Sequence, residues 1–218
     1  DHQITYCCPK PINSVEDSWH YVVSSKDIQH IPLSVAKDNP YVWKTAMWGG
    51  PRDWEFIKRL SELRSLEEHA SAMKWSHGEG FIVGDTDQKK APWVTGKPVV
   101  ETDALRKFVI DEQSLPVCEH KLFNRGRSRK KAIFGGPHIL FGQGPKADRG
   151  FVAALLRDNA VFRHSILGIA GPKDHEAHLG AVCVTLLTEV CRYFAMMTSS
   201  KWLVERDELE KGEVMCLP

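Results

Sequence analysis

The sequence predicts an α+β fold, in which strands and helices do not alternate regularly along the chain. Three observations predict it: several short β-type runs, two amphipathic helix patterns in the first half, and a long apolar segment near the C-terminal end. Of the 218 residues, 42% are hydrophobic and 26% are charged, the ordinary balance of a globular protein. A sizeable core can therefore be buried.

In the first half, β-type runs alternate with helix signals. Pro51 suits the first position of a helix, and apolar residues then recur at spacing three from Trp54 to Leu63. Ser65 and Glu68 form a capping-box pattern that starts a second helix. We expect strands over residues 19–23, 41–45 and 81–83, and helices over residues 27–31, 51–63, 65–73 and 105–110.

In the second half the pattern is clearer. Asp158-Asn159 predicts a turn between two apolar runs, and Val182, Leu186, Val190 and Phe194 recur at four-residue steps along a helix. The helix over residues 175–197 is apolar on more than one side and should be largely buried. We expect strands over residues 138–141, 151–156 and 161–169, and helices over residues 175–197 and 205–211.

We expect an irregular lead-in over residues 1–18 and one domain over residues 19–218. The alternative is that this domain consists of two subdomains, with a boundary near residues 111–133. The chain begins at Asp1 without a Met and ends inside an apolar run at Leu217-Pro218, which predicts a fragment of a larger protein. The six cysteines show no framework spacing, so a reducing, cytoplasmic compartment is expected. Polar and charged residues interrupt the most apolar stretch, and no membrane partner is expected.

No motif in the chain predicts a complete catalytic or metal site. Asp38-Asn-Pro-Tyr41 has one proline where amino-methylating enzymes carry two, and no glycine-rich cofactor turn precedes it. His175-Glu-Ala-His178 is one residue short of a metalloprotease pattern and is typical of a solvated helix N-terminus. We therefore expect no catalytic residue, no metal and no cofactor in this chain.

A basic segment is the feature that favours a function. Lys121–Lys131 carries six cations in eleven residues and no acid. Guanidinium groups suit phosphate oxygens and the guanine edge, so the segment predicts contact with double-stranded DNA, with a solvated loop as the alternative. The six candidates are Lys121, Arg125, Arg127, Arg129, Lys130 and Lys131.

Several stretches together resemble the C-terminal target-recognition region of N-6 adenine DNA methyltransferases of restriction–modification systems. They are VWKTAMWGGPRDW at residues 42–54, GEGF at residues 78–81, FGGPHILFGQG at residues 134–144, and the tail from His178 to Pro218. The chain departs from the pattern at Thr188-Glu189, where the family carries an Asn-Ser pair.

The resemblance implies that a preceding methylase domain of the parent binds S-adenosylmethionine and methylates DNA, while this chain is a non-catalytic recognition module that contacts that domain. It adds Trp43, Lys44 and Arg52 as DNA-facing candidates. The alternative is an interaction domain that docks the methylase to a nuclease or another restriction–modification subunit. An independent hydrolase is disfavoured, because the sequence shows no nucleophile–base–acid constellation.

Overall fold

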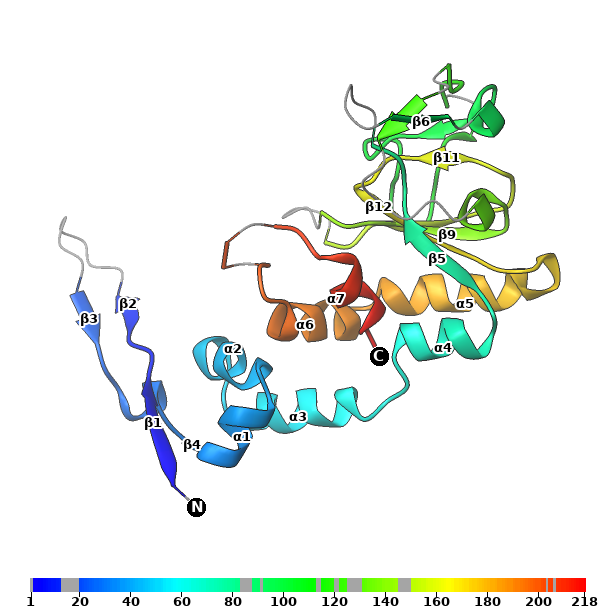
Figure 1. The fold of residues 1–218 in the computed structure, drawn as a ribbon. Helices are drawn as coiled ribbons and strands as arrows, with labels where there is room; N and C mark the ends of the chain where they lie inside the picture. The colour runs from blue at the N-terminus through cyan, green and yellow to red at the C-terminus, as the bar shows by residue number, and fades with distance from the viewer. Residues whose placement is uncertain are drawn as a thin grey trace. The chain divides into compact units, whose positions relative to one another are not determined.

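The computed structural model divides the chain into two compact units (Figure 1). Unit 1 comprises Asp1–Leu63 with Met197–Ser199, and unit 2 comprises Arg64–Met196 with Ser200–Pro218. The division falls at residue 63 and not within residues 111–133. The structure describes residues 2–12, 20–82, 88–90, 92–112, 115–119, 122–124, 131–144, 150–202, 204–205 and 207–218.

Unit 1 combines two antiparallel strand pairs with three helices. Strand β1 pairs with β4, and β2 pairs with β3. The lead-in over residues 1–18 is therefore not irregular throughout: along β1 the side chains of Ile4 and Tyr6 are half-buried and alternate with exposed ones, as a strand with one covered face requires. The strands are β1 (Gln3–Cys7), β2 (Lys10–Ile12), β3 (His20–Val22) and β4 (Ile28–Pro32).

Two expected elements of unit 1 have the other secondary structure. Residues 41–45 begin helix α2 (Tyr41–Trp48), because Val42, Thr45 and Ala46 occupy one helical face and are buried there. The aromatic and β-branched residues of this run favour a strand, but the packing of the buried face selects the helix. The helix expected over residues 27–31 is largely β4, which follows a single 3₁₀ turn, η1 (Ser25–Asp27).

The helix signals around Pro51 and Ser65 are confirmed. Helix α3 (Pro51–Ser61) starts at the proline, and the Asp53 carboxylate accepts a hydrogen bond of 2.7 Å from the Gly50 amide. Helix α4 (Leu66–Ala72) has the predicted capping box, with Ser65 and Glu68 bonded reciprocally. Helix α1 (Leu33–Asp38) completes unit 1.

Unit 2 is built on a four-stranded antiparallel sheet of order β10-β9-β12-β5. The expected strands at residues 138–141 and 151–156 are confirmed, and the run at 161–169 forms a two-residue strand and a longer one. Phe81, which was expected in a strand, makes only an isolated bridge to Arg163. The sheet strands are β5 (Ser76–Glu79), β9 (His138–Gly142), β10 (Ala153–Leu156) and β12 (Ile166–Ala170).

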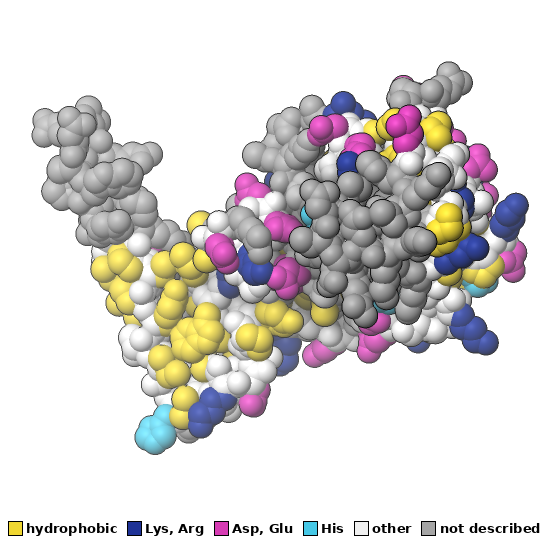
Figure 2. Space-filling view, turned by 45° about the horizontal axis from the view of Figure 1, so that its top comes forward, with side chains coloured by type: hydrophobic (Ala, Val, Ile, Leu, Met, Phe, Trp, Pro, Cys, Tyr) yellow, Lys and Arg dark blue, Asp and Glu magenta, His cyan; other side chains and the backbone are white. Residues whose placement is uncertain are grey.

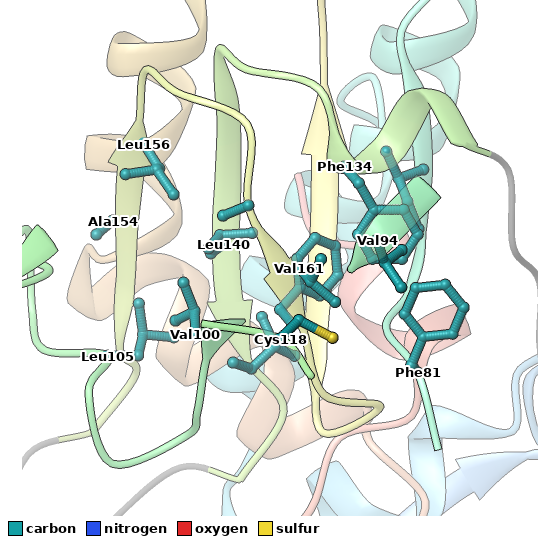
Figure 3. Packing of buried hydrophobic residues seen from close by; sticks show 14 of the residues in the cluster. Phe81, Val94, Val100, Leu105, Cys118, Phe134, Leu140, Ala154, Leu156 and Val161 are labelled. Atoms are coloured by element: carbon teal, nitrogen blue, oxygen red, sulfur yellow. The ribbon is translucent and has the colours of Figure 1, made fainter. Parts of the chain in front are cut away.

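Both faces of this sheet are covered, which explains why every residue of β9 and β12 is buried. Helix α5 (Glu176–Leu186) packs against β9 and β10, and the 3₁₀ turn η4 (Lys131–Phe134) packs against β12 and β5. On the η4 side, Leu140 and Phe134 join a large hydrophobic cluster, shown in Figure 3. This cluster fixes the segments that carry the candidate site.

Short elements lie beside this cluster. Strand β11 pairs in parallel with β7, and β6 pairs antiparallel with β8. Residues 105–110 form a turn closed by a bridge between Leu105 and Ile110 and not the expected helix, and Phe108 has a φ of 68° there. The elements are β6 (Gln88–Lys90), η2 (Pro92–Val94), β7 (Val99–Val100), β8 (Leu122–Asn124) and β11 (Val161–Phe162).

The apolar segment at residues 175–197 is helical, as expected, but it is divided. A short 3₁₀ turn, η5 (Lys173–His175), leads into α5; helix α6 (Glu189–Thr198) follows after a break, and the two parts are bent by 61°. The charged helix expected over residues 205–211 is instead α7 (Lys211–Met215). Among the described residues, no single helix has both the length and the apolar character needed to cross a membrane; α5 and α6 reach them only when taken together.

Candidate nucleic-acid interface

The basic segment contains strand β8, and its last residue, Lys131, is the first residue of the turn η4. Of its six cations only Lys131 lies in the described part of the chain; Lys121, Arg125, Arg127, Arg129 and Lys130 lie outside it. Strand β6, whose sequence is Gln-Lys-Lys, pairs with β8, so Lys89 stands opposite Phe123 and Lys90 opposite Leu122.

At the other end of the segment, Lys131 meets a tryptophan and a second lysine. The Lys131 ammonium lies 5.8 Å from the centroid of the Trp93 ring. The Lys97 ammonium lies 5.7 Å from the same centroid. Both distances are within the range of a cation–π interaction. We call Trp93, Lys97 and Lys131 the indole–lysine cluster.

Buried aromatic side chains hold this cluster in place. The Trp93 ring packs against Phe81 and Phe134, at centroid distances of 5.8 Å and 5.5 Å. Phe81 and Phe134 stack on each other at 4.8 Å, with an angle of 11° between the rings. Turn η4 has an exposed end at Lys131 and buries Ile133 and Phe134, so the core fixes the backbone that presents the lysine.

The indole–lysine cluster has the chemistry of a nucleic-acid contact. Lysine ammonium groups are compact charges that suit phosphate oxygens, and a half-exposed indole can stack on a base. Lys97 and Trp93 were not identified from the sequence, because neither belongs to a local run of charge. They approach Lys131 because the Trp93 ring packs against Phe134, which belongs to the same turn as Lys131.

This chain matches no protein-family model and no curated protein. A functional interpretation of the indole–lysine cluster therefore depends on its own geometry and on the basic segment that ends at Lys131.

The other three DNA-facing candidates belong to unit 1, whereas the indole–lysine cluster belongs to unit 2. Trp43 is 37% exposed and its ring contacts that of Tyr6 at 5.8 Å. Lys44 is half-buried, and its ammonium donates a hydrogen bond of 2.7 Å to the Ser199 carbonyl oxygen. Arg52 is exposed in the first turn of α3. Lys44 is the weakest of the three candidates, because its charge already has a partner.

The two histidines of the 175–178 motif are not a solvated helix end. The Trp75 indole N–H donates to His175 Nδ1 at 2.9 Å, and His178 Nε2 lies 3.0 Å from His69 Nε2. These contacts join α4 to the start of α5. In the chain segments that the structure describes, no three metal-binding side chains converge.

Burial and charge act together on the His69–His178 pair. The pKa of His69 is lowered from its ordinary value by partial burial, then by repulsion from His178 and from Arg64. Nearby carboxylates have other partners: Glu68 bonds Ser65, Glu67 lies 3.2 Å from His77, and Glu176 bonds Arg157. One proton between the two Nε2 atoms suits the contact, whereas two charged rings would repel each other.

Proposed function

We propose that this chain is a DNA-binding, target-recognition module of a larger S-adenosylmethionine-dependent N-6 adenine DNA methyltransferase of a restriction–modification system. The observation that carries the proposal is the convergence of Lys97 and Lys131 on the Trp93 indole, at the end of a segment with five further cations. The resemblance of the chain to the recognition regions of those enzymes supports the same conclusion.

In this proposal the chain binds and the rest of the parent catalyses. Lysines 97 and 131 contact phosphates on either side of the strand that passes Trp93, and arginines of the basic segment read base edges. The parent's N-terminal methylase domain supplies S-adenosylmethionine and the catalytic loop, and the target adenine is flipped toward it. The proposal includes a cytoplasmic location, in keeping with six cysteines that form no disulfide.

A duplex titration with matched variants tests the proposal. Lys97→Gln with Lys131→Gln removes two positive charges and leaves polar side chains that are only slightly shorter, so duplex binding should weaken on every sequence. The control is Lys173→Gln, which removes one exposed cation of unit 2 outside the cluster. If the double variant and the control bind duplex DNA like the unmodified chain, the indole–lysine cluster is not a DNA contact.

The second candidate function is a docking domain, and exposed hydrophobic side chains of unit 1 favour it. Trp48 is 46% exposed and Phe56 is 41% exposed, and hydrophobic surface gathers on the face of unit 1 seen at the lower left of Figure 2. Large exposed apolar patches mark protein interfaces. A docking domain would bind its protein partner with little dependence on the cations of residues 121–131, which separates the two candidates.

A further inference from the structure

Unit 2 contains a pocket of about 300 Å³ at the edge of its main hydrophobic cluster. It lies between the parallel pair β7–β11, the isolated bridge from Phe81 to Arg163, and residues 116–119. Figure 3 shows Phe81, Cys118 and Val161, which reach this region from three separate segments. The volume is at the lower end of the range for small-molecule sites.

The floor of the pocket is flat and apolar. Phe81 is 1% exposed and Phe162 is fully buried, and both line the pocket. The opposite wall is held by backbone pairing, since the Val99 amide donates to the Pro116 carbonyl oxygen at 2.8 Å. Val117 stands at the mouth and is 60% exposed. The apolar surface that a ligand can reach is therefore aliphatic, from Pro116 and Val117 at the mouth, and the two buried rings support it from beneath.

The polar groups of the pocket are an arginine and two glutamates. The Arg163 Nε donates to both carboxylate oxygens of Glu101, at 2.9 Å and 3.0 Å. This ion pair uses only Nε, so the terminal nitrogens of Arg163 have no hydrogen-bond partner among the residues that the structure describes. Glu119 likewise makes no hydrogen bond or ion pair within the described segments. The pocket thus offers an oriented set of N–H donors and one carboxylate acceptor.

We propose that this pocket binds a guanine base. Guanine presents two acceptors, O6 and N7, on one edge, and arginine is their commonest protein partner. Its adjacent edge carries the N1–H and N2–H₂ donors, which a carboxylate accepts. Arg163 matches the first edge, Glu119 matches the second, and the accessible aliphatic surface of Pro116 and Val117 matches the apolar ring face. The base can come from a free nucleotide or from a nucleic-acid strand, and only the second source depends on the proposed function.

Calorimetry with guanosine monophosphate and with inosine monophosphate tests this site. Inosine lacks the N2 amino group, so it should bind more weakly than guanosine. Glu119→Gln should weaken guanosine binding by about tenfold to a hundredfold, because it removes a charged hydrogen-bond acceptor, and should reduce the preference over inosine. Glu62→Gln is the matched control, since Glu62 is an exposed glutamate of unit 1.

A second arm separates the two sources of the base. A single-stranded oligothymidine with one central guanine is compared with the same strand without it. Preference for the guanine strand without binding of the free nucleotide assigns the site to an extruded base. Absence of guanine preference in both arms, or unchanged guanosine binding by Glu119→Gln, would overturn the proposal. Loss of duplex binding by the Lys97 and Lys131 variants is independent of either result, so the two proposals can fail separately.

Discussion

His138 is a buried polar side chain with one unsatisfied nitrogen. It is fully buried in β9, and its Nδ1–H donates to the Ile133 carbonyl oxygen at 2.9 Å. Its Nε2 has no hydrogen-bond partner among the described residues. Burial lowers the pKa of His138 to about 4, although the hydrogen bond to Ile133 opposes this shift. The imidazole is therefore neutral in the folded protein at neutral pH.

This pKa predicts acid destabilisation of unit 2. The pKa of His138 is lower in the folded chain than in the unfolded chain, so the unfolded chain binds the proton first as the pH falls. The free energy of unfolding is therefore unaffected by His138 above pH 6.5 and decreases as the pH falls from 6.5 toward about 4. The loss should approach roughly 3 kcal/mol across this interval. Denaturant unfolding at several pH values measures it. His138→Leu should show a smaller loss over the same interval, and an equal loss in both proteins would contradict the assignment.

The His69–His178 pair predicts a shifted titration that depends on one neighbour. The midpoint for His69 should lie below 6.5, and His178→Ala should raise it, because the repulsion from His178 disappears. Part of the lowering should remain, since burial is its largest cause. Nuclear magnetic resonance titration of the ring signals follows His69 directly. An unchanged midpoint in His178→Ala would show that the two rings do not interact in solution.

At the scale of elements, the break at residues 187–188 decides which apolar side chains are buried. Leu186 is 2% exposed, but Val190, four residues later in the expected stripe, is 46% exposed. The stripe was derived for a continuous helix, and the bend of 61° starts a new helix with a different inward face. Helical periodicity locates the apolar segment, but it does not reveal an interruption that tertiary packing imposes.

A pair of truncations tests the burial of α5. Leu186→Ala should destabilise the protein by about 2–5 kcal/mol, because it removes a side chain packed in the core. Val184→Ala, in the same helix, should change stability by less than about 0.5 kcal/mol, since Val184 is 55% exposed. Equilibrium unfolding in denaturant gives both values. Equal effects of the two substitutions would show that the buried face of the helix has been assigned incorrectly.

The elements that could be predicted have local causes. Helices α3 and α4 begin at Pro51 and Ser65 because a proline and a capping box fix their first turns. Helix α2 was missed because the burial of one helical face outweighs the strand preference of its residue types. Lys131 was found through its neighbours in sequence. Trp93 and Lys97 could not be found in that way, because only the tertiary packing of Trp93 on Phe134 brings them to Lys131.

At the scale of the whole molecule, the proposed function assigns methyl transfer to another part of the parent. This chain alone should therefore not bind S-adenosylmethionine. The physical reason is the lack of a glycine-rich turn that would approach the cofactor and of a second proline in Asp38–Tyr41. Calorimetry with the cofactor checks this expectation. Binding at micromolar concentration would contradict the assignment of cofactor binding to the methylase domain of the parent.

The basic segment should contribute in two ways to DNA binding by the whole molecule. Replacing Lys130 and Lys131 should weaken binding to all duplexes alike and flatten the salt dependence by about two units or less. Replacing one of the arginines Arg125, Arg127 and Arg129 should instead cost about 1–3 kcal/mol on the preferred sequence and relax the choice at one position, if that arginine reads a base.

The salt dependence of duplex binding tests the central claim most directly. The logarithm of the association constant is measured against the logarithm of salt concentration, for the chain and for the variant in which Lys121, Arg125, Arg127, Arg129, Lys130 and Lys131 are all replaced by glutamine. Each phosphate contact releases counterions and contributes about 0.9 to the slope. If the basic segment binds phosphates, the slope is steep and negative for the chain and markedly flatter for the variant. Equal slopes, or duplex binding that does not change with salt, would contradict it.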